Sequence, residues 1–212
     1  MTETTSRAEI HGNVVNFYTQ GLADSVGISL KRTYRVPDDH HQHGLPPHAG
    51  DFPVIRVEDV KYNLPSDIAE KGGIMIPMHP FEAMWMYFNG RRYRPSALQI
   101  SAGKVNAITG QLFDGFLTVN PQDYMVIGGT DRGQIWLDGW RTADGQVRQF
   151  IAAVMGQGRT VEFQVTGKEE HGGIQLILVE AKHDLFPSQR APETIRHRFL
   201  GGDEKSVGLK LD

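Results

Sequence analysis

The chain contains no cysteine, which excludes disulfide bonds, thiolate metal ligands and a cysteine nucleophile. It also contains no apolar run long enough to cross a bilayer as a helix, because its most apolar windows, 83–88 and 174–179, have the length of buried strands. The first ten residues lack the basic start and apolar stretch of a signal peptide. We therefore expect a cytoplasmic protein without a membrane span.

Charge of either sign is nearly balanced, with 22 Lys and Arg against 25 Asp and Glu and a net charge of -3. This balance argues against a nucleic-acid partner, because such binding needs a basic face that displaces counterions. Several catalytic and nucleotide-binding motifs are also missing, namely GxSxG, GxxxxGK[ST], GxGxxG before a helix, and HExxH. No cofactor is therefore predicted.

The sequence between residues 124 and 181 is rich in short apolar segments separated by glycine turns. Asp144-Gly145 predicts a hairpin between the segments on either side of it. In RTVEFQVTG, Val161, Phe163 and Val165 alternate with Glu162, Gln164 and Thr166, which predicts a strand with one dry and one wet face. Turns at intervals of about ten residues are typical of an all-β protein, either an antiparallel β-sandwich or a barrel.

The earlier part of the chain extends this prediction. Strands are expected over 27–36, 54–60 and 83–88, and Pro37–Pro53 is expected to be a long loop. The stretch 65–73 predicts one or two helical turns that end at Gly72. Asn89-Gly90 predicts a two-residue hairpin, with a return strand over 92–102 that forms an edge or a bulge at Pro95.

These patterns divide the chain into an N-terminal arm, a single β domain and a C-terminal extension. The arm comprises residues 1–26 and contains at most a weak first strand. The β domain covers 27–181, and the extension covers 182–212 with a short, minor C-terminal helix at 191–200. The predicted fold is thus all-β, with a long N-terminal loop and little helix.

Several long blocks resemble an uncharacterised protein family found in bacteria and fungi. They are KRTYRVPDD, EKGGIMIPMHPFEAMWMYF, ALQISAGKVNAITG, PQDYMVIGGTDRGQIWLDGW and VRQFIAAVMGQGRTVEFQVTGKEEHGGIQL, and together they span most of residues 31–178. The resemblance implies no established activity, cofactor or catalytic residue. Some members of the family carry a membrane-protein label, which raises the alternative of a membrane-associated accessory protein.

Histidines gather in the predicted loop, where imidazole side chains could bind a metal ion. A metal site needs rigid, oriented ligands, and a loop with adjacent histidines and flanking prolines offers few of them. We expect adventitious metal binding there rather than a physiological site. The residues are His40, His41, His43 and His48.

Two other places carry acid–base groups. His79 and Glu82 form an HPFE tetrad, and a buried Glu82 would need a partner such as Arg91, Arg92, Arg94 or Lys104. Glu169, Glu170 and His171 lie in a glycine-flanked turn, where a carboxylate beside an imidazole can transfer protons. His79, Glu82 and His171 converging inside a barrel would make a cupin-like metal-dependent enzyme, which is the alternative hypothesis.

Arginine and tryptophan side chains are the candidates for ligand binding. Arg91, Arg92 and Arg94 could hold an anion through their guanidinium groups, or form a solvated hairpin end. Trp136 and Trp140 could contact a glycan, although at least one of them is expected in the core.

The leading hypothesis is a non-catalytic binding or assembly module, with a small-molecule, anionic or glycan ligand. Many strands, glycine turns and the lack of an assembled catalytic set support it. Sheet edges need protection, and self-association is one common solution, so a homo-oligomer is a candidate assembly.

Overall fold

The computed structural model describes most of the chain, and the secondary structure within it is 42% strand and 12% helix. This confirms the prediction of a mostly β protein, and every strand pair is antiparallel. Within the described residues the sheets do not close on themselves, so the barrel alternative is wrong. The described residues are 6–19, 25–37, 39, 41, 43–91, 94–129 and 133–181.

The larger sheet has the strand order β1-β2-β3-β7-β13-β12, with β4 also paired to β3 and β11 also paired to β7. Its first two strands form a hairpin within the predicted N-terminal arm. β4 lies inside the predicted long loop. The strands are β1 (Ser6–His11), β2 (Val14–Thr19), β3 (Ser25–Thr33), β4 (His48–Asp51), β7 (Ala83–Asn89), β11 (Trp136–Leu137), β12 (Gly139–Arg141) and β13 (Val147–Ile151).

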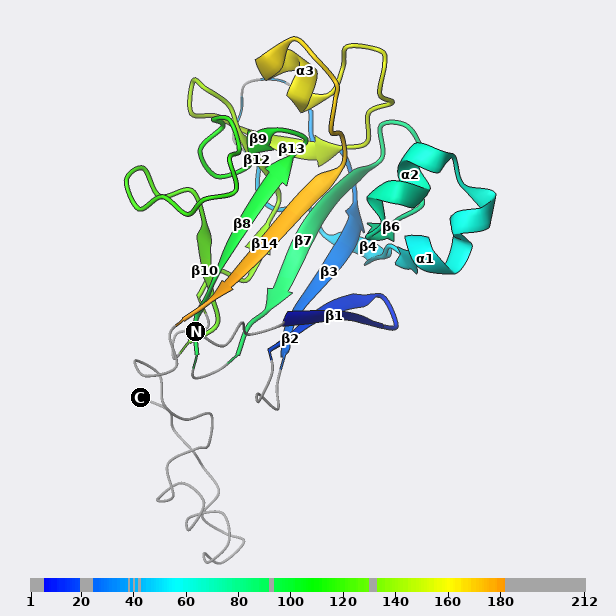
Figure 1. The fold of residues 1–212 in the computed structure, drawn as a ribbon. Helices are drawn as coiled ribbons and strands as arrows, with labels where there is room; N and C mark the ends of the chain where they lie inside the picture. Colours follow the sequence, from blue (N-terminus) through cyan, green and yellow to red (C-terminus); the bar gives the residue numbers. More distant parts are fainter. Residues whose placement is uncertain are drawn as a thin grey trace, which may run out of the picture.

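The second sheet has the order β10-β8-β14, with β9 also paired to β8. Its strands are β8 (Ser96–Ala102), β9 (Val105–Asn106), β10 (Met125–Ile127) and β14 (Ile174–Glu180). A separate pair joins β5 (Ile55–Arg56) and β6 (Ile74–Met75). Figure 1 shows α3 at one end of the sheets and the other helices to one side. The helices are α1 (Val57–Val60), α2 (Ser66–Lys71) and α3 (Val161–Thr166), with a 3₁₀ turn at Lys61–Asn63.

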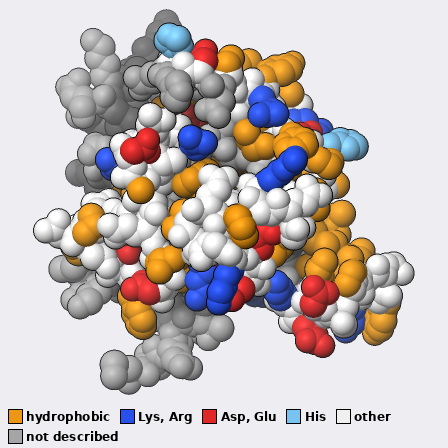
Figure 2. All heavy atoms as spheres, turned by 90° about the horizontal axis from the view of Figure 1, so that it is seen from above, with side chains coloured by type: hydrophobic (Ala, Val, Ile, Leu, Met, Phe, Trp, Pro, Cys, Tyr) orange, Lys and Arg blue, Asp and Glu red, His pale blue; other side chains and the backbone are white. Residues whose placement is uncertain are grey.

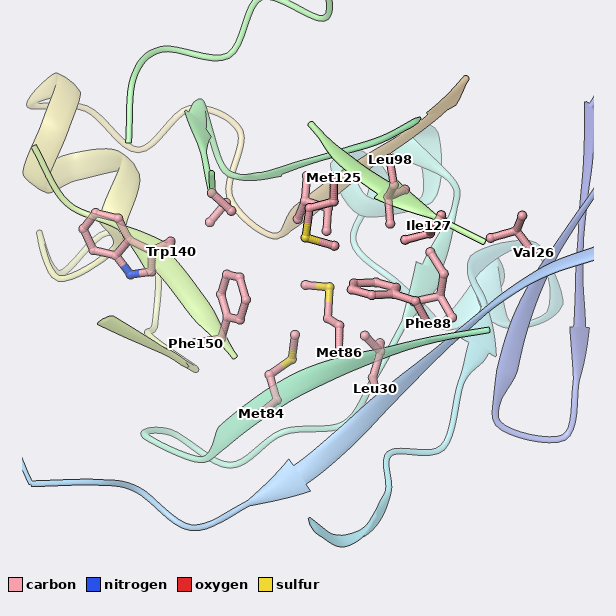
Figure 3. Packing of buried hydrophobic residues seen from close by; sticks show 14 of the residues in the cluster. Val26, Leu30, Met84, Met86, Phe88, Leu98, Met125, Ile127, Trp140 and Phe150 are labelled. Atoms are coloured by element: carbon pink, nitrogen blue, oxygen red, sulfur yellow. The ribbon is translucent and has the colours of Figure 1, made fainter. Parts of the chain in front are cut away.

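The hydrophobic core lies between the two sheets. On β7, Met84, Met86 and Phe88 point inward, because alternate residues of a strand face the same side. They meet Leu98 and Ile127 from the second sheet (Figure 3). In Figure 3 the core residues extend from Val26 at one end to Trp140, Phe150 and Met84 at the other.

The predicted hairpin at Asn89-Gly90 is wrong. β7 pairs with β3, β11 and β13, whereas β8 belongs to the second sheet, so the chain changes sheets after Gly90. A Cβ atom on Gly90 would lie only 2.2 Å from the backbone nitrogen of Gly128. Glycine is needed here because two backbone segments approach closely. The prediction instead attributes this glycine to the positive φ of a hairpin turn. β8 begins at Ser96, after Pro95, and pairs with strands on both sides, so it is neither an edge strand nor bulged at the proline.

The predicted strand at 161–166 is wrong as well, because this segment is the helix α3. The Thr160 hydroxyl accepts a hydrogen bond from the Phe163 N–H, and Gly167 ends the helix in the left-handed conformation with φ 73. The predicted alternation is therefore lost: Glu162 is buried, while Phe163, Gln164 and Val165 in succession are exposed. Local capping outweighed an alternation that was only six residues long.

Other local predictions hold. The turn containing Asp144-Gly145 joins β12 to β13 as a hairpin, with Trp140 paired to Arg148. α2 ends at Gly72, whose φ of 65 disfavours other residues. The predicted strand at 54–60 is reduced to β5 and is followed at once by α1. The predicted helix at 191–200 lies outside the described residues. Among the helices that the structure does describe, none is long and apolar enough to cross a membrane.

Candidate functional site

A cavity of about 1240 Å³ opens at the end of the core next to α3. It enters between the two sheets, so its inner wall is the hydrophobic core itself. Trp140, Phe150 and Met84, which lie together at one end of Figure 3, belong to this wall. Its apolar lining includes Leu30, Met84, Ala102, Trp140, Phe150, Ile174 and Leu176.

The opposite end of the core is closed by an ion-pair cluster. Arg91 follows β7 and is 2% exposed, and its guanidinium group binds the carboxylate of Glu180 at the end of β14. It also donates to the Phe17 carbonyl on β2, at 3.3 Å. Arg94 Nε lies 3.6 Å from the other oxygen of Glu180. These contacts link the two sheets at this end of the core.

This arrangement bears on the predicted arginine cluster. Arg91 and Arg94 do not form a solvated hairpin end, because both are buried and contact an internal carboxylate. Arg92 lies outside the described residues. Binding of an external anion by this cluster stays a prediction.

Glu162 contributes a polar group to the cavity lining, although this residue is only 2% exposed. Its carboxylate accepts hydrogen bonds from the backbone N–H groups of His171, at 3.1 Å, and Gly172, at 2.8 Å. The ring Nδ1 of His171 lies 3.2 Å away. Gly103 leaves room for the carboxylate, since a Cβ atom there would lie 2.6 Å from Glu162 Oε2.

Two opposing effects act on the pKa of Glu162. Burial raises the pKa, but the hydrogen bonds from Gly172 and His171 outweigh it, so the pKa falls below its ordinary value of 4.5. The carboxylate is thus held as an anion at neutral pH. His171 does pair with a carboxylate, as its sequence context suggested, but the partner is Glu162, whereas Glu169 accepts from Thr160 and the Gly156 N–H.

Phe81 stands at the mouth of the cavity in an unusual backbone conformation. The Glu82 N–H donates to the His79 carbonyl at 3.1 Å, which closes a turn with Pro80 second and Phe81 third. Phe81 has φ 66, the left-handed value that the third position of such a turn requires and that non-glycine residues rarely adopt. Its own N–H donates to the Ala152 carbonyl at 2.8 Å, which holds the turn against the strand end.

The HPFE tetrad is therefore a turn. The Glu82 carboxylate accepts from the His79 N–H at 2.9 Å and lies 2.5 Å from Arg32 Nε on β3. The partners predicted for Glu82 are wrong, since the sheet pairing of β3 with β7 brings Arg32 to it. His79 itself is exposed.

The predicted metal ligands do not assemble. Among the residues that the structure describes, no three His, Asp or Glu side chains form a group that could hold a metal ion, so His79, Glu82 and His171 do not make such a centre. His43 Nε2 lies 2.8 Å from Asp39 Oδ1, and His41 Nδ1 lies 3.4 Å from it. His48 lies on β4 beside Trp85, and His40 lies outside the described residues.

The two candidate tryptophans have different surroundings. Trp140 is 8% exposed and belongs to the core and to the cavity wall, which confirms that one of the pair is a core residue. Trp136 is 40% exposed on β11, opposite Tyr87 of β7. Its contact with a glycan stays a prediction.

Sequence reasoning missed three residues of the cavity as site residues: Glu162, Arg35 and Arg159. A signal existed for the first, because Thr160 and Gly167 are spaced as the two caps of a short helix. The arginines carried none, since they meet only through long-range packing.

No protein-family model, curated protein or solved structure matches the chain.

Proposed function

We propose that this protein is a non-catalytic β-sandwich binding module that takes a small, largely apolar molecule into the cavity beside α3. The observation that carries the proposal is the cavity of about 1240 Å³ that enters the core. Protein interiors are close-packed, so a hollow that reaches core side chains offers apolar surface to a ligand. Ligand sites are typically concave and apolar, with a few well-placed polar groups.

The form of the two ends of the core supports this proposal. At the closed end, Arg91 and Glu180 join the sheets. At the open end, Leu30, Leu176 and Phe150 line a space together with the buried carboxylate of Glu162. The Glu162 oxygens already accept hydrogen bonds from several N–H groups. This arrangement favours a structural role for the carboxylate over the role of a general base. The geometry therefore favours binding over the cupin-like alternative.

A neutral fluorescent dye such as Nile red tests the proposal. We expect saturable binding with one site per chain, because the apolar wall can bury the dye. The variant Leu176→Trp should weaken binding by about tenfold or more, since its larger side chain fills the cavity from β14. Fluorescence titration measures the dissociation constant.

Val179→Trp is the matched control, because Val179 lies on the same strand, is 40% exposed and does not line the cavity. It should bind the dye like the wild type. Thermal unfolding of both variants verifies that they are folded. Absence of saturable dye binding, or equal binding by a folded Leu176→Trp variant, would contradict the proposed function.

A further inference from the structure

Two arginines meet at one aromatic ring in the mouth of the cavity. The guanidinium carbon of Arg35 lies 6.0 Å from the ring centroid of Phe81, and that of Arg159 lies 5.7 Å from it. Arg35 follows β3 and Arg159 precedes α3, so segments distant in sequence converge here. All three residues line the cavity.

The positive charge of this pair is not neutralised by an ion pair within the described part of the chain. None of the three described carboxylates in the lining forms an ion pair with either arginine: Asp39 pairs with His43, Glu162 pairs with His171, and Asp138 pairs with neither Arg35 nor Arg159. Two guanidinium groups near one ring concentrate positive charge there, and this charge attracts an anion. Figure 2 views the molecule from the α3 side and shows basic side chains among hydrophobic ones on this face.

The backbone of Phe81 adds an independent observation. A bulky residue in the left-handed region is unfavourable and persists only where its surroundings hold it. Here the Ala152 carbonyl and the Glu82 turn hold it. The chain thus maintains an unfavourable conformation at the point where it presents a ring to two cations.

We propose that the ligand of this cavity is an amphiphile with an anionic head and an apolar tail, whose head is bound by Arg35 and Arg159. This inference rests on the proposed function. Guanidinium groups bind carboxylate and phosphate oxygens through charge-assisted hydrogen bonds. The tail enters the wall formed by Met84, Phe150 and Leu176. The volume is large enough to hold such a tail.

Competition against Nile red tests the head group. Dodecanoate below its micelle concentration is compared with 1-dodecanol, which has the same tail and no charge. We expect dodecanoate to bind the wild type about tenfold more tightly than the alcohol. Raising the salt concentration should reduce this preference, because the arginines are solvent-exposed.

The double variant Arg35→Gln/Arg159→Gln removes both charges at the mouth. It should bring dodecanoate and dodecanol to within about threefold of each other, with both affinities measured on the variant itself. Arg56→Gln/Lys61→Gln is the matched control, because it removes the same charge outside the cavity, including a Lys61 ammonium 5.2 Å from the Tyr62 ring centroid. The control should keep the full preference for dodecanoate.

The outcomes separate the two proposals. If Nile red binds but the two ligands compete equally, or if the preference survives in Arg35→Gln/Arg159→Gln, the anionic head is wrong and the proposed function stands. If neither dye nor ligand binds, both proposals fail. If vesicles of anionic phospholipid bind through the same two arginines while monomeric dodecanoate does not, a membrane surface replaces the free amphiphile and this inference is overturned.

Discussion

Glu162 carries a negative charge at a position almost without contact with water. Three groups, the N–H of His171, the N–H of Gly172 and the ring of His171, compensate for its lost hydration. The carboxylate joins α3 to the turn before β14 and so shapes one wall of the cavity. Glu162 therefore fixes the position of the turn at His171 and Gly172, and its protonation state affects the free energy of unfolding.

We expect Glu162→Gln to lower the free energy of unfolding at pH 7 by about 1–3 kcal/mol, because the amide replaces an anionic acceptor by a neutral one and adds an N–H₂ group. The pKa of Glu162 is lowered in the folded state, so its contribution is complete above the ordinary value of 4.5 and is lost as pH falls through the folded pKa. Urea unfolding at several pH values measures this.

The difference between wild type and Glu162→Gln should shrink as the solution is acidified below pH 4.5. Glu170→Gln is the control, since its side chain is 58% exposed and should change stability by at most about 0.5 kcal/mol. A difference that stays constant from pH 7 to pH 3 would show that the charge of Glu162 is not the source of the effect.

At the scale of elements, the connection from β7 to β8 decides the architecture. The strands on either side of Gly90 belong to different sheets, and the chain passes close to the backbone at Gly128 where it crosses. Gly128 is itself constrained, with φ 76 and a hypothetical Cβ atom 2.5 Å from the Arg91 carbonyl oxygen. The crossing therefore depends on glycine at both positions, because a side chain at either one would collide with the backbone of the other segment.

Gly90→Ala should lower the free energy of unfolding by about 3 kcal/mol, because its Cβ atom would meet the backbone of Gly128 at 2.2 Å. Gly44→Ala is the matched control: nothing lies within 4 Å of its Cβ position, and its φ is not left-handed. The control should leave stability unchanged or raise it slightly. Equal chemical denaturation midpoints for the two variants would contradict the close approach.

At the scale of the whole molecule, the two ends of the core differ in kind. One end is joined by Arg91, which contacts the first sheet at Phe17 and the second sheet at Glu180. The other end is open and holds the cavity. A closed end that keeps the sheets at a fixed separation allows the other end to stay open without collapse of the core.

Glu180→Gln should destabilise the protein by about 3–5 kcal/mol, because it replaces the carboxylate that binds the buried guanidinium group of Arg91 by a neutral amide. Glu9→Gln, which removes an ion pair with the exposed Arg7, is the control and should cost at most about 1 kcal/mol. Thermal unfolding compares the two. Equal small losses would show that the Arg91–Glu180 pair does not hold the sheets together.

The sequence by itself determined the mostly β class, the hairpin at Asp144-Gly145 and the helix that ends at Gly72, because these depend on local backbone preferences. Only the tertiary structure decided that β7 pairs with β3 and not with β8, that Glu162 is buried, and that Arg35 and Arg159 meet at Phe81. These features arise from contacts between segments far apart in the chain. Such contacts leave no periodic pattern in the sequence, because the two partners come together only when the sheets pack.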